Sequence, residues 1–275
     1  MLLPCARFRS VVAGALVAAT ALVLLAGCAT GDFLRSAHKS MARAMRVETP
    51  DAFFGPVLAR ATGEPRPPAP SWQARQHYLA VISHLEGLSP EAENTLKRQG
   101  TLGDAFALKT LAQWRLGRTD DARASALRAR ASGQEALDAQ NRALLRAFEG
   151  VMRLHAAYDA LEQGKPLEDI EQMITSESGV WRVLAGARTE VGRAHPLQRE
   201  LILTRLAAYK VLRDAREKYP EAAGANEGDW KRLRAGAEVE LAELAALPAD
   251  IPSRLAAVVQ QWQKLCGLDP PKIPG

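Results

Sequence analysis

Residues that could hold a metal ion are sparse in this chain of 275 residues. The closest pair among its five histidines is His77 and His84, which are seven residues apart. On a helix both imidazoles would share one face, two turns apart, whereas a metal site requires more closely clustered ligands. The sequence also lacks the HExxH, CxxC and glycine-rich phosphate-loop motifs. We therefore predict neither a metal site nor a cofactor, and we assign these histidines to helix packing.

Acid–base catalysis is suggested by one segment, ITSESGVW at residues 174–181. Its Glu177-Ser178 pair resembles the catalytic Glu-Ser of lytic transglycosylases, envelope enzymes in which a glutamic acid of raised pKa serves as both acid and base. The chain departs from that family downstream, where RVLAGARTEVG replaces the Gly-Leu-Met-Gln segment. The simpler interpretation is that Ser176 or Ser178 caps the next helix. We predict that the protein is not an enzyme, and peptidoglycan cleavage through Glu177 is kept as an alternative.

The third chemically distinctive residue is Cys28, which ends an apolar run. Arg7 and Arg9 precede the run, and residues 10–27 carry no charge. This pattern is typical of a secretory signal peptide, although about 18 uncharged residues are also near the lower limit for a membrane span. The run ends in Leu-Ala-Gly-Cys at residues 25–28, which resembles the lipobox of bacterial lipoproteins. The resemblance implies that the signal is cut before Cys28, whose sulfur carries diacylglycerol and whose new amine is acylated.

The same resemblance predicts where the protein resides. Aspartate after the lipidated cysteine often retains a lipoprotein in the inner membrane, and Ala29 stands there instead. We therefore predict a lipid anchor in the outer membrane, with the body in the periplasm. Removing residues 1–27 takes away Arg7 and Arg9 and no acid, which lowers the net charge from +5 to +3. This modest charge and the periplasmic address argue against a nucleic-acid partner.

Residues 28–70 are predicted to be a lipidated basic tether followed by a proline-rich spacer. No acid lies between Asp32 and Glu48, and the basic residues near the anchor fall at helical spacing: Arg35, Lys39, Arg43 and Arg46. A solvated helical face or tether is the simpler interpretation, because charge runs are usually solvated. Contact with anionic lipid headgroups is the alternative. The spacer TGEPRPPAP, residues 62–70, favours an extended and semi-rigid conformation.

Residues 71–275 are predicted to form an all-α body. Apolar residues make up 47% of the chain and charged residues 24%, which is typical of a folded globular protein. Ser89-Pro90-Glu91 has the cap, first-turn proline and acid of a helix start. Cys266 would be the only cysteine of this body, so it excludes an intramolecular disulfide.

The clearest structural unit is GDAFALKTLAQWRLGRTDDARASALRARA, residues 103–131. It resembles a tetratricopeptide repeat (TPR): LGRTDDA matches the turn between the two helices, and Phe106, Ala112, Ala122 and Ala129 match its large and small packing positions. Lys109 and Thr110 depart from the family pattern, and no regular period of about 34 residues extends along the chain. The resemblance implies antiparallel helical hairpins stacked as a short TPR-like α-solenoid.

The last predicted helix, SRLAAVVQQWQKLCG, carries an apolar stripe that contains Trp262 and Cys266. We expect it to cap the helical stack, with Cys266 as a buried apolar residue, and a docked partner helix is the alternative. The function that fits this architecture is a non-catalytic scaffold or adaptor, which binds the membrane through acyl chains on Cys28 and an envelope protein or peptide through its helices. The alternative is a helical lipoprotein that binds a small ligand for a solute transporter, which would require an enclosed pocket.

Overall fold

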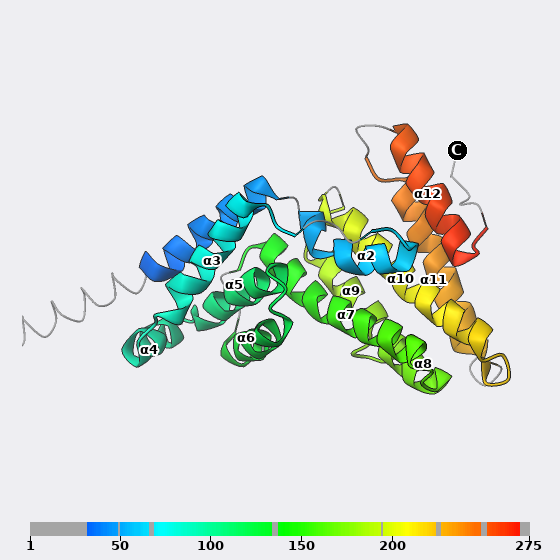
Figure 1. The fold of residues 1–275 in the computed structure, drawn as a ribbon, viewed down its shortest axis with the longest axis horizontal. Helices are drawn as coiled ribbons and strands as arrows, with labels where there is room; N and C mark the ends of the chain where they lie inside the picture. Colours follow the sequence, from blue (N-terminus) through cyan, green and yellow to red (C-terminus); the bar gives the residue numbers. More distant parts are fainter. Residues whose placement is uncertain are drawn as a thin grey trace, which may run out of the picture. The chain divides into compact units, whose positions relative to one another are not determined.

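The computed structural model describes residues 32–48, 50–65, 69–133, 137–193, 195–223, 227–248 and 252–269. Cys28 and the apolar run before it lie outside the described residues. Within those ranges the chain is helical and contains no strand, as the sequence predicts (Figure 1). A first helix covers residues 32–47. The later elements are η1 (Pro50–Phe53), α2 (Gly55–Thr62), α3 (Trp72–Glu86), α4 (Pro90–Arg98), α5 (Leu102–Arg115), α6 (Thr119–Ser132), α7 (Ala139–Glu162), α8 (Leu167–Thr175), α9 (Val180–Thr189), α10 (Leu197–Lys218), α11 (Glu227–Ala245) and α12 (Pro252–Cys266).

Contacts divide the chain into two compact units that alternate along the sequence. Among the described residues, unit 1 contains those up to Val47 and those from Trp72 to Gly133, and unit 2 contains those from Glu48 to Ser71 and from Leu137 to Asp269. The division differs from the boundary expected at residue 70, because helices on both sides of residue 48 pack into the folded units. The segment expected to be a tether therefore contributes to both units.

Unit 1 begins with the helix at residues 32–47. This helix buries Ala37, Met41 and Ala44, which follow one another at helical spacing. The hydroxyl group of Tyr78, on α3, lies 4.0 Å from the sulfur of Met45. The basic segment is therefore a packed helix, because the apolar stripe on its other side is buried in unit 1.

The start of α4 confirms the predicted cap. The hydroxyl group of Ser89 accepts a hydrogen bond of 3.3 Å from the amide of Ala92, and Pro90 occupies the first position of the helix. Serine here satisfies one of the amides that the helix cannot pair internally.

Helices α5 and α6 lie antiparallel and form the hairpin that the repeat pattern predicts (Figure 1). Gly117 ends α5 with a φ of +76°, and the next amide, that of Arg118, donates to the carbonyl of Gln113 at 2.9 Å. This arrangement is the Schellman ending, which favours glycine. Ala122 and Ala129 are fully buried, so small residues bring the two helices close together.

The closest approach in this hairpin involves Gly103 and Gly133. A β-carbon placed on Gly103 would overlap the carbonyl oxygen of Gly133 and would lie 3.0 Å from the carbonyl oxygen of Ala129. Glycine at position 103 therefore lets the start of α5 contact the backbone at the end of α6.

Unit 2 is built around α10. Helices α2, α7, α8, α9, α11 and α12 all pack against it. Its buried residues occur on every side, since Leu201, Ile202, Leu203 and Thr204 are consecutive and all buried. A helix that is buried on all sides is expected in the centre of a helical body.

Helix α2 and the preceding turn complete this core, although the sequence assigned them to the tether. Phe53, Phe54 and Val57 are buried. Arg60 pairs with Asp159 at 2.8 Å and with Glu162 at 2.7 Å, both on α7. A short apolar helix flanked by prolines thus belongs to unit 2.

The last helix packs on α10 and α11. Val259, Trp262 and Cys266 from its apolar stripe are buried. This burial agrees with the cap interpretation, because the stripe is covered by the protein's own helices.

We predict that Gly103→Ala destabilises the protein by about 2–3 kcal/mol, the cost of forcing an extra group into a packed contact. Alanine is otherwise the better helix former by about 1 kcal/mol, so helix propensity alone predicts the opposite sign. Urea denaturation followed by circular dichroism measures the difference. Gly87→Ala is the control, because a β-carbon there would meet only the carbonyl oxygen of Ser83 at 3.9 Å. Equal free-energy changes for the two variants would contradict the close contact.

Candidate functional site

The basic residues predicted near the lipid anchor share the exposed face of the first helix. Arg35, Lys39, Arg43 and Arg46 are all exposed, opposite the buried stripe of that helix. Arg35 pairs with Asp32 at 3.9 Å, with both side chains in solvent. Among the described residues no acid lies within ion-pair distance of the other three. The helix therefore presents a row of cations, which we call the basic face.

The histidines do not assemble a metal site in the part of the chain that the structure describes. His77 and His84 both lie on α3 and are half-buried. No group of three or more metal-binding side chains occurs among the described residues.

Glu177 lies in the turn between α8 and α9, outside any enclosed site. Its side chain is 94% exposed and pairs with Arg182 at 3.8 Å. The expected serine cap is wrong: Gly179 is the N-cap of α9 and no side chain bonds there. The tight turn explains why glycine occupies this N-cap position. A β-carbon on Gly179 would lie only 2.7 Å from the carbonyl oxygen of Ile174.

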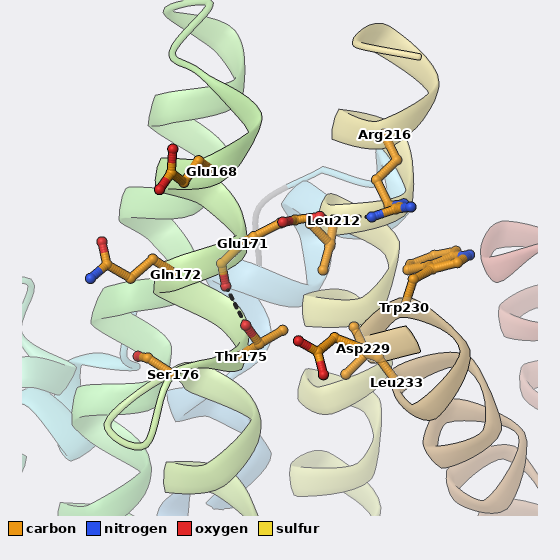
Figure 2. Close-up of a pocket in the computed structure, with 10 residues that line it drawn as sticks. All are labelled: Glu168, Glu171, Gln172, Thr175, Ser176, Leu212, Arg216, Asp229, Trp230 and Leu233. Carbon is orange, nitrogen blue, oxygen red and sulfur yellow. Dashed lines mark hydrogen bonds and ion pairs between the residues drawn. The ribbon is translucent and has the colours of Figure 1, made fainter. Parts of the chain in front are cut away.

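A pocket of about 310 Å³ lies in unit 2, and its lining residues come from α8, α10 and α11 and from the residue that follows α8 (Figure 2). Figure 2 shows Arg216 and Trp230 on the side opposite α8. The pocket is lined by Glu168, Glu171, Gln172, Thr175, Ser176, Leu212, Arg216, Asp229, Trp230 and Leu233. No pattern in the sequence indicated this site, because its three helices are separated by loops and their residues share no local spacing.

The wall of this pocket is fixed by Arg216. Its guanidinium donates to Glu171 at 2.7 Å and to Glu227 at 3.3 Å, and it also donates to the carbonyl oxygen of Ala223. The same group lies 5.0 Å from the ring centre of Trp230. Trp230 stacks on Tyr209 with 5.0 Å between ring centres. The arginine is thus fully engaged in holding α8, α10 and the start of α11 together.

A second group of charges joins α9, α10 and α11 inside unit 2. The carboxylate of Glu240 accepts from Arg188 at 2.5 Å and also from Arg205. The Arg205 guanidinium lies 4.0 Å from the ring centre of Trp181, and Arg188 also pairs with Glu243. We call these four charged residues the Glu240 network.

Gln198 completes the Glu240 network on the α10 side. Its side-chain oxygen accepts from Nε of Arg188 at 2.9 Å, and its amide donates to the carbonyl oxygens of Arg188 and Val191 at 3.0 and 3.1 Å. Burial raises the pKa of Glu240, and Arg205 and Arg188 act in the opposite direction. Burial lowers the pKa of Arg205, which Glu240 opposes. Each charge is therefore tolerated in the interior because of its partner.

Cys266 has no reactive character. Its Sγ lies 3.6 Å from the carbonyl oxygen of Leu206, and burial raises the pKa of the thiol to about 12. The thiolate is the reactive form of cysteine, so this residue is inert at neutral pH. The prediction that Cys266 is a buried packing residue is confirmed.

Comparisons of the chain with protein-family models, curated proteins and solved structures found no significant match. None of the helices in the described residues combines the length and apolar character needed to cross a bilayer.

We predict that Glu240→Gln destabilises the protein by about 3 kcal/mol, because it leaves the buried Arg205 without a countercharge and removes one of the two carboxylates that pair with Arg188. Urea denaturation at neutral pH measures the free energy of unfolding. The control is Glu238→Gln on the same helix, where an exposed pair with Arg234 at 3.2 Å is lost. That change is expected to cost less than about 0.5 kcal/mol. Similar losses for both variants would show that the Glu240 network does not support unit 2.

Proposed function

We propose that this chain is an outer-membrane lipoprotein whose helical periplasmic body is a non-catalytic scaffold for another envelope protein or peptide. The observation that carries the proposal is the position of the packed first helix. Only residues 29–31 separate Cys28 from Asp32, where the described part of this helix starts. Four residue steps span at most about 14 Å. A lipid anchor at Cys28 therefore holds the folded unit 1 at the membrane surface.

The basic face supports this placement. Acyl chains on Cys28 contribute about 0.8 kcal/mol of membrane affinity per buried methylene group. Each basic side chain near an anionic leaflet adds about 1 kcal/mol. Because the helix is packed in unit 1, its cations lie on one fixed surface, and lipid contact is favoured over a solvated tether.

The scaffold role is supported by the helical hairpins and by two exposed apolar side chains in unit 1. The α5–α6 hairpin has the small-residue packing of a TPR-like repeat, and stacked hairpins of this kind provide extended binding surfaces. Most large apolar residues are buried, yet Trp72 is 76% exposed and Leu127 is 67% exposed. Exposed aromatic and aliphatic side chains are typical anchors of protein interfaces. On this proposal the partner is a protein or peptide, and nucleic acid has no role.

A second candidate function, capture of a small ligand for a solute transporter, is favoured by one observation. The pocket beside Arg216 has a volume of about 310 Å³ and several polar groups. This volume is near the lower end of the range for small-molecule sites, about 300–1,000 Å³. Peptidoglycan cleavage has no such support, since Glu177 is exposed and does not line this pocket.

We predict that cells expressing the full chain incorporate labelled palmitate into it, and that Cys28→Ser abolishes this label. The physical reason is that the Cys28 sulfur and amine are the proposed acyl carriers. Globomycin, which blocks the lipoprotein signal peptidase, should cause the precursor to accumulate. Ala29→Asp should move the protein from the outer to the inner membrane fraction.

Ala29→Ser is the control for the sorting experiment and should leave the protein in the outer membrane. Undiminished palmitate labelling of the Cys28→Ser variant would overturn the lipid anchor. An unchanged distribution of the Ala29→Asp variant would overturn only the predicted choice of membrane.

A further inference from the structure

The basic face belongs to a folded unit that is basic as a whole. Among the described residues, unit 1 contains 13 lysine and arginine side chains and 7 carboxylates, which gives a net charge of +6. The described part of unit 2 contains 19 such cations and 22 carboxylates, which gives a net charge of −3. The two units therefore differ in the sign of their charge, and the positive unit is the one that carries the first helix. An anionic surface attracts unit 1 and does not attract unit 2.

Two exposed apolar side chains lie at the ends of the basic face. Phe33 is 40% exposed and Val47 is 41% exposed, although most large apolar residues are buried. They are 14 residues apart, close to four turns of about 3.6 residues, so both lie on the same side of the helix, between the basic face and the buried stripe. A row of cations beside exposed apolar side chains is typical of helices that bind in the headgroup region of a bilayer.

The position of the first helix in the chain favours a bilayer as the occupant of this surface. Asp32 is four residue steps from Cys28, the proposed acyl carrier, so the membrane lies beside the start of the helix. Arg35 and Arg46 are 11 residues apart, about 16 Å along the helix axis. A continuous anionic surface contacts the whole row of cations, whereas one small anion reaches only one or two of them.

We propose that unit 1 binds anionic phospholipid surfaces in its own right, without acyl chains. The basic face contacts the headgroup phosphates, and Phe33 and Val47 insert into the interfacial region. Unit 2 takes no part in this contact. The inference rests on the proposed function for the address of the protein, and it adds the lipid class and two apolar contacts to the basic face.

The test is co-sedimentation of lipid vesicles with the mature chain carrying Cys28→Ser, which has no acyl chains. In low-salt buffer we expect binding to vesicles of equal parts phosphatidylglycerol and phosphatidylcholine, and no binding to phosphatidylcholine alone. Arg35→Gln/Arg43→Gln should weaken the binding about 25-fold, because each basic side chain near an anionic leaflet contributes about fivefold. High salt should also weaken the binding, since it screens the surface charges.

The matched charge control is Arg118→Gln/Arg123→Gln, which removes two exposed cations of unit 1 from α6 and the residue before it. It should weaken the binding less than about threefold, because charges away from the contact are screened. Phe33→Ala should weaken the binding about threefold, since binding strength scales with the apolar area that is buried. Its control is Leu127→Ala on α6, where the side chain is 67% exposed and the affinity should not change.

The protein in this test carries no lipid, so its result is independent of palmitate labelling. Failure here leaves the anchor at Cys28 in place, and loss of the anchor leaves this contact in place. Absence of binding, equal binding to neutral and anionic vesicles, or equal weakening by both double variants would overturn the proposal. An unchanged affinity of the Phe33→Ala variant would overturn the apolar contact. Tighter binding to poly-L-glutamate than to the vesicles would assign the basic face to an acidic protein and overturn the lipid assignment.

Discussion

Unit 2 depends on a carboxylate that is buried between two arginines. Glu240 of α11 is 4% exposed and bonds to Arg188 of α9 and Arg205 of α10. Burying one of these charges alone would cost several kcal/mol, so the loss of one charged partner is expected to destabilise the packing of the three helices. Because α10 also contacts α2, α7, α8 and α12, this constraint reaches the whole unit.

The two units use different means of close packing. Unit 1 relies on small residues: Gly103, Ala122 and Ala129 let the backbones of α5 and α6 approach each other. Unit 2 relies on a long central helix with internal ion pairs. The basic face lies on the first helix and Trp72 on α3, both in unit 1, whereas the polar pocket belongs to unit 2.

Local signals in the sequence predicted much of the fold. The cap at Ser89 and the turn at Gly117 both depend on residues within one or two turns of each other. Two other features depend on distant residues and were missed. The apolar residues of α2 are buried against α7 and α10, which both come much later in the chain. Arg188 and Glu240 are 52 residues apart, and no helical periodicity connects them. The pocket was missed for the same reason, since α8 and α11 come together only across α10.

The most direct test of the membrane-surface placement is lipid quenching of a fluorophore on the first helix. Ala42→Cys places a label on the exposed side of that helix, and Ala124→Cys places a matched label on the exposed side of α6. Labelling of the lipidated protein is selective because the thiol of Cys266 is buried and has a pKa of about 12. In vesicles containing anionic phospholipids with brominated acyl chains, we predict stronger quenching at position 42 than at position 124, and weaker quenching at position 42 in high salt. Equal quenching at both positions would contradict contact between the basic face and the membrane.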